Sequence, residues 1–124
     1  MAVNLLESRR RALTFSMPEN LYKDGDKTFT AIGMYELSKP LPPGNYKIYV
    51  DVASTDTERQ NSFFRFMRSD ETEVASTMLP RKYNVFKVTL TDTVTHLYMY
   101  ASENYSRSVG DTATFSKIKI IKVK

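Results

Sequence analysis

The residue types that most often carry out catalysis are scarce in this sequence. It contains one histidine, His96, and no cysteine. No serine lies in the glycine pattern of a nucleophile elbow, and one imidazole without thiolates does not make a typical metal site. Carboxylate pairs such as Asp51 and Glu103 have the chemistry for glycoside hydrolysis, but the sequence does not place them together. We therefore predict a protein that is not an enzyme and that uses no metal or cofactor.

Tyrosines on the polar side of two predicted strands are more informative. Residues 45–54 and 95–102 alternate between an apolar set and a second set that contains tyrosine. If the two strands share a sheet, the second sets form one polar and aromatic surface. Tyrosine rings suit the C–H faces of sugars, and charged neighbours suit sugar hydroxyls. The candidate glycan-binding residues are Lys47, Tyr49, Asp51, His96, Tyr98 and Tyr100, with Tyr105 and Arg107 in a turn-rich loop. Packing on cross-strand neighbours explains any single outward tyrosine slightly better than sugar binding does, and the cluster as a whole fits either explanation.

The segment 61–69 is apolar on both of its faces. Phe64 and Phe66 are expected to point inward, and a subunit interface explains the opposite face better than a ligand site. The interface candidates are Phe63, Arg65, Met67, Arg9, Arg10 and Arg11. The mixture of aromatic residues and arginine is similar to RNA-binding strands, but the glycines and the element order of that class are missing. A nucleic-acid partner is therefore not expected.

The elements that would position these residues are short strands separated by turn-forming residues. The predicted strands are residues 11–17, 28–37, 45–54, 62–69, 73–79, 83–91, 95–102 and 113–123. Pro42 and Pro43 cannot donate ladder hydrogen bonds, and Gly44 permits a tight reversal into the third of these strands. About eight strands with little helical periodicity predict an all-β, antiparallel β-sandwich or barrel.

The two ends of the chain leave alternatives open. Residues 3–13 have apolar residues at helical spacing, but we favour extended structure from about residue 11 and treat 1–10 as an N-terminal arm or a short helix. In the last strand the alternation changes phase between Ile120 and Ile121, which indicates a bulge or a strand buried on both faces. We find no repeat or linker, so we expect a single domain, 1–124.

The net charge and the hydropathy of the chain argue against some classes of protein. Eighteen basic and fourteen acidic residues give a net charge of +4, which fits an exposed basic edge better than a nucleic-acid site. No apolar run approaches the roughly 20 residues that cross a bilayer. Arg9–Arg11 interrupt any signal-peptide core, so we expect synthesis in the cytoplasm without a signal peptide and no membrane partner.

The order of several short motifs resembles that of a known group of modules. The motifs are "NLL" at 4–6, "ALTFS" at 12–16, "LPPGNYKIYVDV" at 41–52, "FKVTL" at 86–90, "HLYMYAS" at 96–102 and "FSKIKIIKVK" at 115–124. They resemble the jelly-roll, carbohydrate-binding-like modules of phage tail, baseplate, fibre and capsid-decoration proteins. The resemblance implies a jelly-roll virion subunit that is homo-oligomeric, with a trimer as one option, and that contacts other virion proteins. This sequence has no tryptophan, the usual stacking residue of sugar-binding relatives.

Three functions follow from these observations. The first is a phage virion structural protein, located in the virion, with a face for a host-surface glycan or receptor. The second is a stand-alone carbohydrate-binding module or lectin that uses the outward tyrosines. The third is a single-stranded nucleic-acid-binding β-barrel, for which about eight strands are too many.

Overall fold

The computed structural model describes residues 18–55, 61–101 and 112–123, and this part of the chain is built from β-strands. The strands are β1 (Lys27–Thr30), β2 (Ile32–Leu41), β3 (Gly44–Ser54), β4 (Asn61–Met67), β5 (Glu73–Pro80), β6 (Tyr83–Leu90), β7 (Val94–Tyr100) and β8 (Thr112–Val123). Within these ranges there is no helix of the length and hydropathy needed to span a bilayer. The all-β, antiparallel prediction is confirmed.

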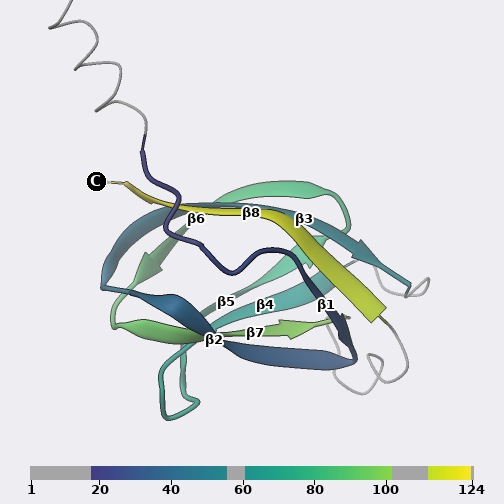
Figure 1. Ribbon diagram of the computed structural model, residues 1–124, viewed down its shortest axis with the longest axis horizontal. Helices are drawn as coiled ribbons and strands as arrows, with labels where there is room; N and C mark the ends of the chain where they lie inside the picture. The colour runs from purple at the N-terminus through teal and green to yellow at the C-terminus, as the bar shows by residue number, and fades with distance from the viewer. Residues whose placement is uncertain (1–17, 56–60, 102–111, 124) are drawn as a thin grey trace, which may run out of the picture.

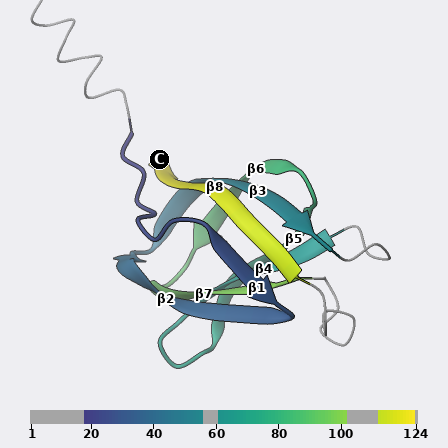
Figure 2. The same ribbon diagram turned by 45° about the vertical axis from the view of Figure 1, so that its right-hand side comes forward.

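The eight strands form two antiparallel sheets that face each other. One sheet has the order β1-β8-β3-β6 and the other the order β2-β7-β4-β5. β1 pairs with β8, β2 with β7, β3 with β6 and β4 with β5, so the pairs are nested inside one another along the chain. This nesting, closed by the β3–β8 and β4–β7 pairs, is the jelly-roll arrangement. Figures 1 and 2 show the two layers from directions 45° apart.

The core lies between the two sheets and follows from the alternation of the strands. In β3, Tyr46, Ile48, Val50 and Val52 are all at most 2% exposed, while the residues between them face outward. Phe64 and Phe66 of β4 and Leu97 and Met99 of β7 meet them from the other sheet at 0% exposure. Each such side chain contributes about 1.5–3 kcal/mol by burial. The inward sets predicted for these strands are confirmed.

The strand bounds match the predicted ones from Pro42 onward. Pro42 and Pro43 join β2 to β3, and Gly44 has a φ of 154°, a value that favours glycine, so the predicted reversal is present. The predicted strand 28–37 is instead β1 and β2, because Ala31 adopts a φ of 63° and turns the chain from one sheet to the other. The predicted strand 11–17 and the alternatives for residues 1–10 lie outside the described residues.

β8 contains the expected irregularity, but earlier than the change of phase in the sequence. Tyr49 pairs with Lys119 whereas Asp51 pairs with Ser116, so two residues of β8 oppose one of β3. Lys117 occupies this bulge with a φ of 53°. The bulge keeps both Phe115 and Ile118 in the core. Ile121 is half-buried on the outer side, so that end of β8 carries apolar residues on both faces.

The segment before β1 closes one side of the sandwich. The backbone N–H of Leu21 donates to the carbonyl of Ile120 at 2.8 Å, which aligns residues 20–22 with β8. Tyr22 is 5% exposed, and its hydroxyl lies 2.6 Å from that of Tyr35 on β2. Burial raises the pKa of Tyr22 to about 12, and it also raises the pKa of Tyr35. The segment thereby ties the two sheets together.

Candidate functional site

The two tyrosine-bearing strands lie in different sheets. β3 belongs to the β1–β8–β3–β6 sheet and β7 to the β2–β7–β4–β5 sheet. Tyr49 and Tyr98 both point away from the core, as predicted, but from opposite sides of the sandwich. The hypothesis of one surface shared by both strands is therefore wrong. Alternation identifies the buried side of a strand, but it does not identify the sheet that the strand joins.

Two separate outer faces result. We call the outer face of the β2–β7–β4–β5 sheet the aromatic face. Its residues are Ile32, Met34, Glu36, Phe63, Arg65, Met67, Ser76, Met78, His96, Tyr98 and Tyr100. We call the outer face of the β1–β8–β3–β6 sheet the lysine face. Its central residues are Asn45, Lys47, Tyr49, Asp51, Tyr83, Val85, Lys87, Thr89, Lys117, Lys119, Ile121 and Val123.

The aromatic face joins two sets of residues that the sequence had suggested for different roles. The glycan candidate Tyr100 pairs with Phe63, Tyr98 with Arg65, and His96 with Met67. Met67 lies on this outer side by register but is only 2% exposed, so it does not offer the contact surface predicted for it. The predicted interface strand and the predicted sugar-binding strand are thus neighbours, and they form one surface.

Three aromatic rings of this face form two tilted pairs that share Tyr100. The ring centroids of Phe63 and Tyr100 are 5.5 Å apart at an interplanar angle of 60°. Those of Tyr98 and Tyr100 are 5.7 Å apart at 64°. Such tilted pairs are favourable and hold each ring in place. All three side chains are half-buried, so each presents part of its ring to the outside.

Arg65 fixes these rings from the middle of the face. Its Nε donates to Oε1 of Glu73 at 2.7 Å, and a terminal nitrogen donates to the hydroxyl of Tyr100 at 3.0 Å. The guanidinium carbon lies 5.8 Å from the ring centroid of Tyr98. Burial alone would lower the pKa of Arg65, but its hydrogen bonds to Glu73 and Tyr100 outweigh this, so the pKa is raised. Arg65 is therefore a permanently charged support for the tyrosines.

A histidine–glutamate pair and two methionines lie on the same face as the rings. Nε2 of His96 lies 3.9 Å from Oε2 of Glu36, and its Nδ1 lies 2.8 Å from the hydroxyl of Thr95. Met34 and Met78, which the sequence analysis missed, are 39% and 55% exposed on the flanking strands β2 and β5. Gly33 before Met34 and Leu79 after Met78 are buried, so the alternation of the strands is the signal that could have placed both methionines outward.

The lysine face contains the remaining described glycan candidates. Tyr49 stacks on Tyr83 with ring centroids 6.4 Å apart at 30°, and Nζ of Lys47 lies 5.4 Å from the Tyr49 ring centroid. Asp51 lies 3.9 Å from Nζ of Lys117. Tyr83 is 48% exposed and was missed, because only its cross-strand position beside Asp51 brings it to Tyr49.

Several candidates are not placed by the structure. Tyr105, Arg107 and Arg9–Arg11 lie outside the described residues. Among the residues that are described, no group of three or more histidine, aspartate or glutamate side chains is arranged to hold a metal ion.

Comparison with known proteins found no matching family model and no matching curated protein. Solved structures of similar shape include two mutants of CBM29-2, a family 29 carbohydrate-binding module. They have TM-scores of 0.48 and 0.46 at 9% and 10% identity, over 85% and 86% of this chain and 84% and 88% of theirs. The ligand-free CBM1 of BiXyn10A has a TM-score of 0.44 at 11% identity, over 86% of this chain and 97% of that one. The jelly-roll fold itself follows from the strand pairing of this chain.

Proposed function

We propose that this protein is a non-catalytic glycan-binding module and that the aromatic face is its sugar-binding surface. The observation that carries the proposal is the cluster in which Tyr98 and Tyr100 contact the guanidinium of Arg65 and Phe63 packs on Tyr100. Half-exposed rings offer apolar planes for the C–H faces of a sugar. The charged and amphipathic groups beside them, including Glu36 and His96, offer partners for hydroxyls.

The preorganisation of this face supports binding rather than simple packing. Ring contacts hold Tyr98 and Tyr100 before a ligand arrives, and Arg65, itself bonded to Glu73, donates a hydrogen bond to the Tyr100 hydroxyl, so little side-chain entropy is lost on binding. The rings sit on two adjacent strands, β4 and β7, of a sheet whose other face is the core. A rigid flat surface of this kind fits an extended sugar chain better than a small molecule that needs a deep cavity.

The test is a glycan array followed by titration calorimetry with the strongest ligand. Tyr98→Ala should weaken binding about tenfold, whereas Tyr98→Phe should keep most of it because the ring remains. Lys23→Ala removes an exposed side chain that lies on neither outer face and is the control. A blank array with folded protein, or equal loss in the Tyr98→Ala and Lys23→Ala variants, would refute the proposal.

A structural subunit of a phage virion, as the motif resemblance implies, is the second candidate. The observation in its favour is the exposure of Met34 and Met78 beside the rings, since exposed apolar patches often mark contacts between subunits. In that case the aromatic face would be covered in a homo-oligomer. Light scattering coupled to size exclusion separates the two candidates. A stable trimer that Met78→Glu converts to a monomer supports the subunit, and a monomer supports the glycan-binding module.

A further inference from the structure

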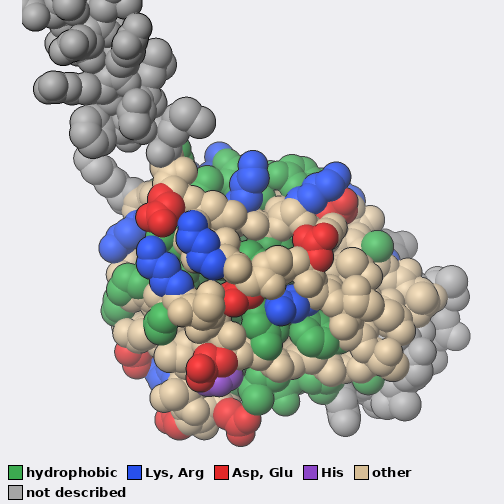
Figure 3. Space-filling view, viewed as in Figure 1, with side chains coloured by type: hydrophobic (Ala, Val, Ile, Leu, Met, Phe, Trp, Pro, Cys, Tyr) green, Lys and Arg blue, Asp and Glu red, His purple; other side chains and the backbone are tan. Residues whose placement is uncertain are grey.

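The lysine face has a chemistry of its own, on the opposite side of the sandwich from the aromatic face. Lys47 of β3 lies directly opposite Lys87 of β6, and Lys119 of β8 lies directly opposite Tyr49. Three lysines on three adjacent strands are therefore neighbours of one tyrosine in the sheet. Figure 3 shows lysine or arginine side chains on the upper part of the molecule, where β3 and β8 lie in Figure 1.

The carboxylates close to this face are gathered at one end of it. Asp51 lies 3.9 Å from Nζ of Lys117, and Asp26 accepts a hydrogen bond from the backbone N–H of Lys117 at 3.2 Å. Within the described part of the chain, no carboxylate lies at ion-pair distance from Lys47, Lys87 or Lys119. The positive charge of these three lysines is therefore not neutralised by described residues.

The direct pairing of Lys47 with Lys87 adds to this argument. Like charges directly opposite each other across two strands destabilise a sheet. An anionic ligand placed between the strands would remove that repulsion. Binding of negative charge therefore stabilises this arrangement more than it would stabilise a surface of mixed charge, which has no such repulsion to relieve.

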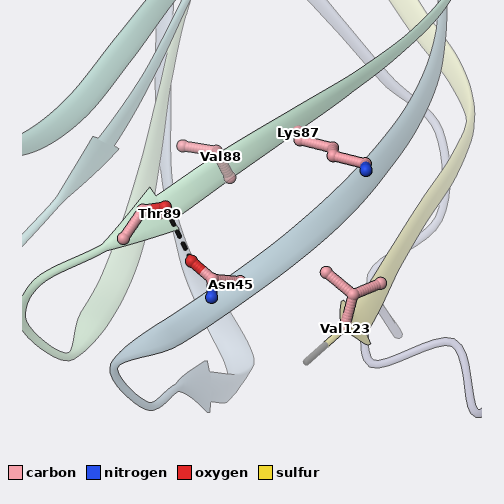
Figure 4. A pocket seen from close by; sticks show the side chains of 5 residues that line it. All are labelled: Asn45, Lys87, Val88, Thr89 and Val123. Carbon is pink, nitrogen blue, oxygen red and sulfur yellow. Dashed lines mark hydrogen bonds between the residues drawn. The ribbon is translucent and has the colours of Figure 1, made fainter.

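A shallow hollow continues the lysine face beyond these residues. It has a volume of about 190 Å³ and is lined by Asn45, Lys87, Val88, Thr89 and Val123. The hydroxyl of Thr89 donates to Oδ1 of Asn45 at 2.7 Å, which leaves the Asn45 amide nitrogen as a donor at the hollow, as Figure 4 shows. The Asn45 amide nitrogen and the Lys87 ammonium border the hollow as hydrogen-bond donors and suit an anionic oxygen.

From these contacts we infer that the lysine face is a second binding surface, for an acidic polysaccharide chain. Its carboxylates or sulfates lie against Lys47, Lys87 and Lys119, with one of them at the Asn45–Lys87 hollow. Its sugar rings lie against the exposed Tyr83 and Val85, which are 48% and 49% exposed. This inference does not depend on the aromatic face.

The geometry favours an acidic polysaccharide over single-stranded nucleic acid. A nucleic-acid groove stacks successive bases on open aromatic rings. Here the Tyr49 ring is flanked by the Lys47 ammonium at 5.4 Å and by the Tyr83 ring at 6.4 Å. Tyr83, which is 48% exposed, therefore offers the open ring surface in this part of the sheet. One open ring cannot stack successive bases, so the affinity must come from charge and from contacts with C–H groups.

The test compares one polymer with and without its charges. The probes are polygalacturonate and its highly methyl-esterified form, which has the same backbone, together with a 20-nucleotide oligothymidine. Lys87→Gln/Lys119→Gln should weaken polygalacturonate binding about tenfold. Lys23→Gln/Lys39→Gln removes the same charge away from the face and should change it less than about twofold.

Three outcomes would overturn the inference. The first is that wild-type protein binds neither form of the polymer, or binds both equally. The second is that the two double-lysine variants lose affinity to the same extent, which would mean that only net charge matters. The third is tighter, lysine-dependent binding of oligothymidine than of polygalacturonate, which would make the lysine face a nucleic-acid site. All four substituted lysines are exposed, and thermal unfolding of each variant confirms that it is folded.

Discussion

Arg65→Lys tests whether Arg65 positions the aromatic face. Lysine keeps the charge but loses the planar fork that reaches Glu73 at 2.7 Å and Tyr100 at 3.0 Å at once. The Glu73 ion pair is partly exposed, with 26% and 38% of the two side chains accessible, so we assign it at most about 1 kcal/mol. Lysine can keep one of the two contacts, so we expect a net loss of about 1 kcal/mol. For a chain of 124 residues this lowers Tm by roughly 3–6 °C.

Binding should change more than stability. Without the fork, the Tyr100 hydroxyl loses its donor and the two tyrosine rings lose a shared support, so we expect affinity for the array-selected glycan to fall about tenfold. Thermal unfolding and titration calorimetry on the same samples measure both effects. Arg68→Lys is the matched control, because Arg68 makes a comparable pair with Asp92 at 2.8 Å but lies outside the aromatic face. If Arg65→Lys lowers Tm and leaves affinity unchanged, Arg65 has only a structural role and our reasoning is wrong.

Two further predictions concern the junction of the sheets. A Cβ on Gly33 would lie 1.8 Å from the Phe29 ring, so Gly33→Ala should cost about 2–3 kcal/mol in urea unfolding, and much less in a Phe29→Ala background. Equal costs in both backgrounds would contradict this. Burial raises the pKa of Tyr22 to about 12 in the folded state, whereas an unperturbed tyrosine has a pKa of 10.0. The contribution of the protonated Tyr22 hydroxyl to the free energy of unfolding is therefore intact below pH 10, and it is lost as the pH rises from about 10 to 12. Tyr22→Phe should make the free energy of unfolding fall less steeply in that window, and an unchanged slope would show that Tyr22 does not titrate there.

Much of the fold was predictable because burial is a local signal in a strand. In β3 and β7 the apolar residues recur at every second position, and the structure buries the predicted sets. The Pro42–Pro43–Gly44 reversal was also visible, because proline and glycine restrict the backbone in known ways. The break at Ala31 was not, since no residue at that point favours a positive φ.

The composition of the candidate site was not predictable for a different physical reason. Whether Tyr49 lies beside Tyr98 depends on which strands pair, and those pairs join residues far apart in the chain, such as Tyr49 with Val85 and Tyr98 with Met34. Alternation carries no information about such partners. The same limit explains why Tyr83 was missed: only pairing of β6 with β3 brings its ring to Tyr49.

The jelly roll separates the two proposed surfaces more completely than one shared sheet would. Each sheet buries one face against the other, so a residue that points outward on β7 cannot contact one that points outward on β3. A ligand on the aromatic face and a ligand on the lysine face therefore share no side chain, and packed interiors about 10 Å thick transmit little of a surface change. The two bindings should be independent in free energy. A chain with two independent faces can hold two polymers at once, or two segments of one polymer, and thereby gain avidity without any contact between the sites.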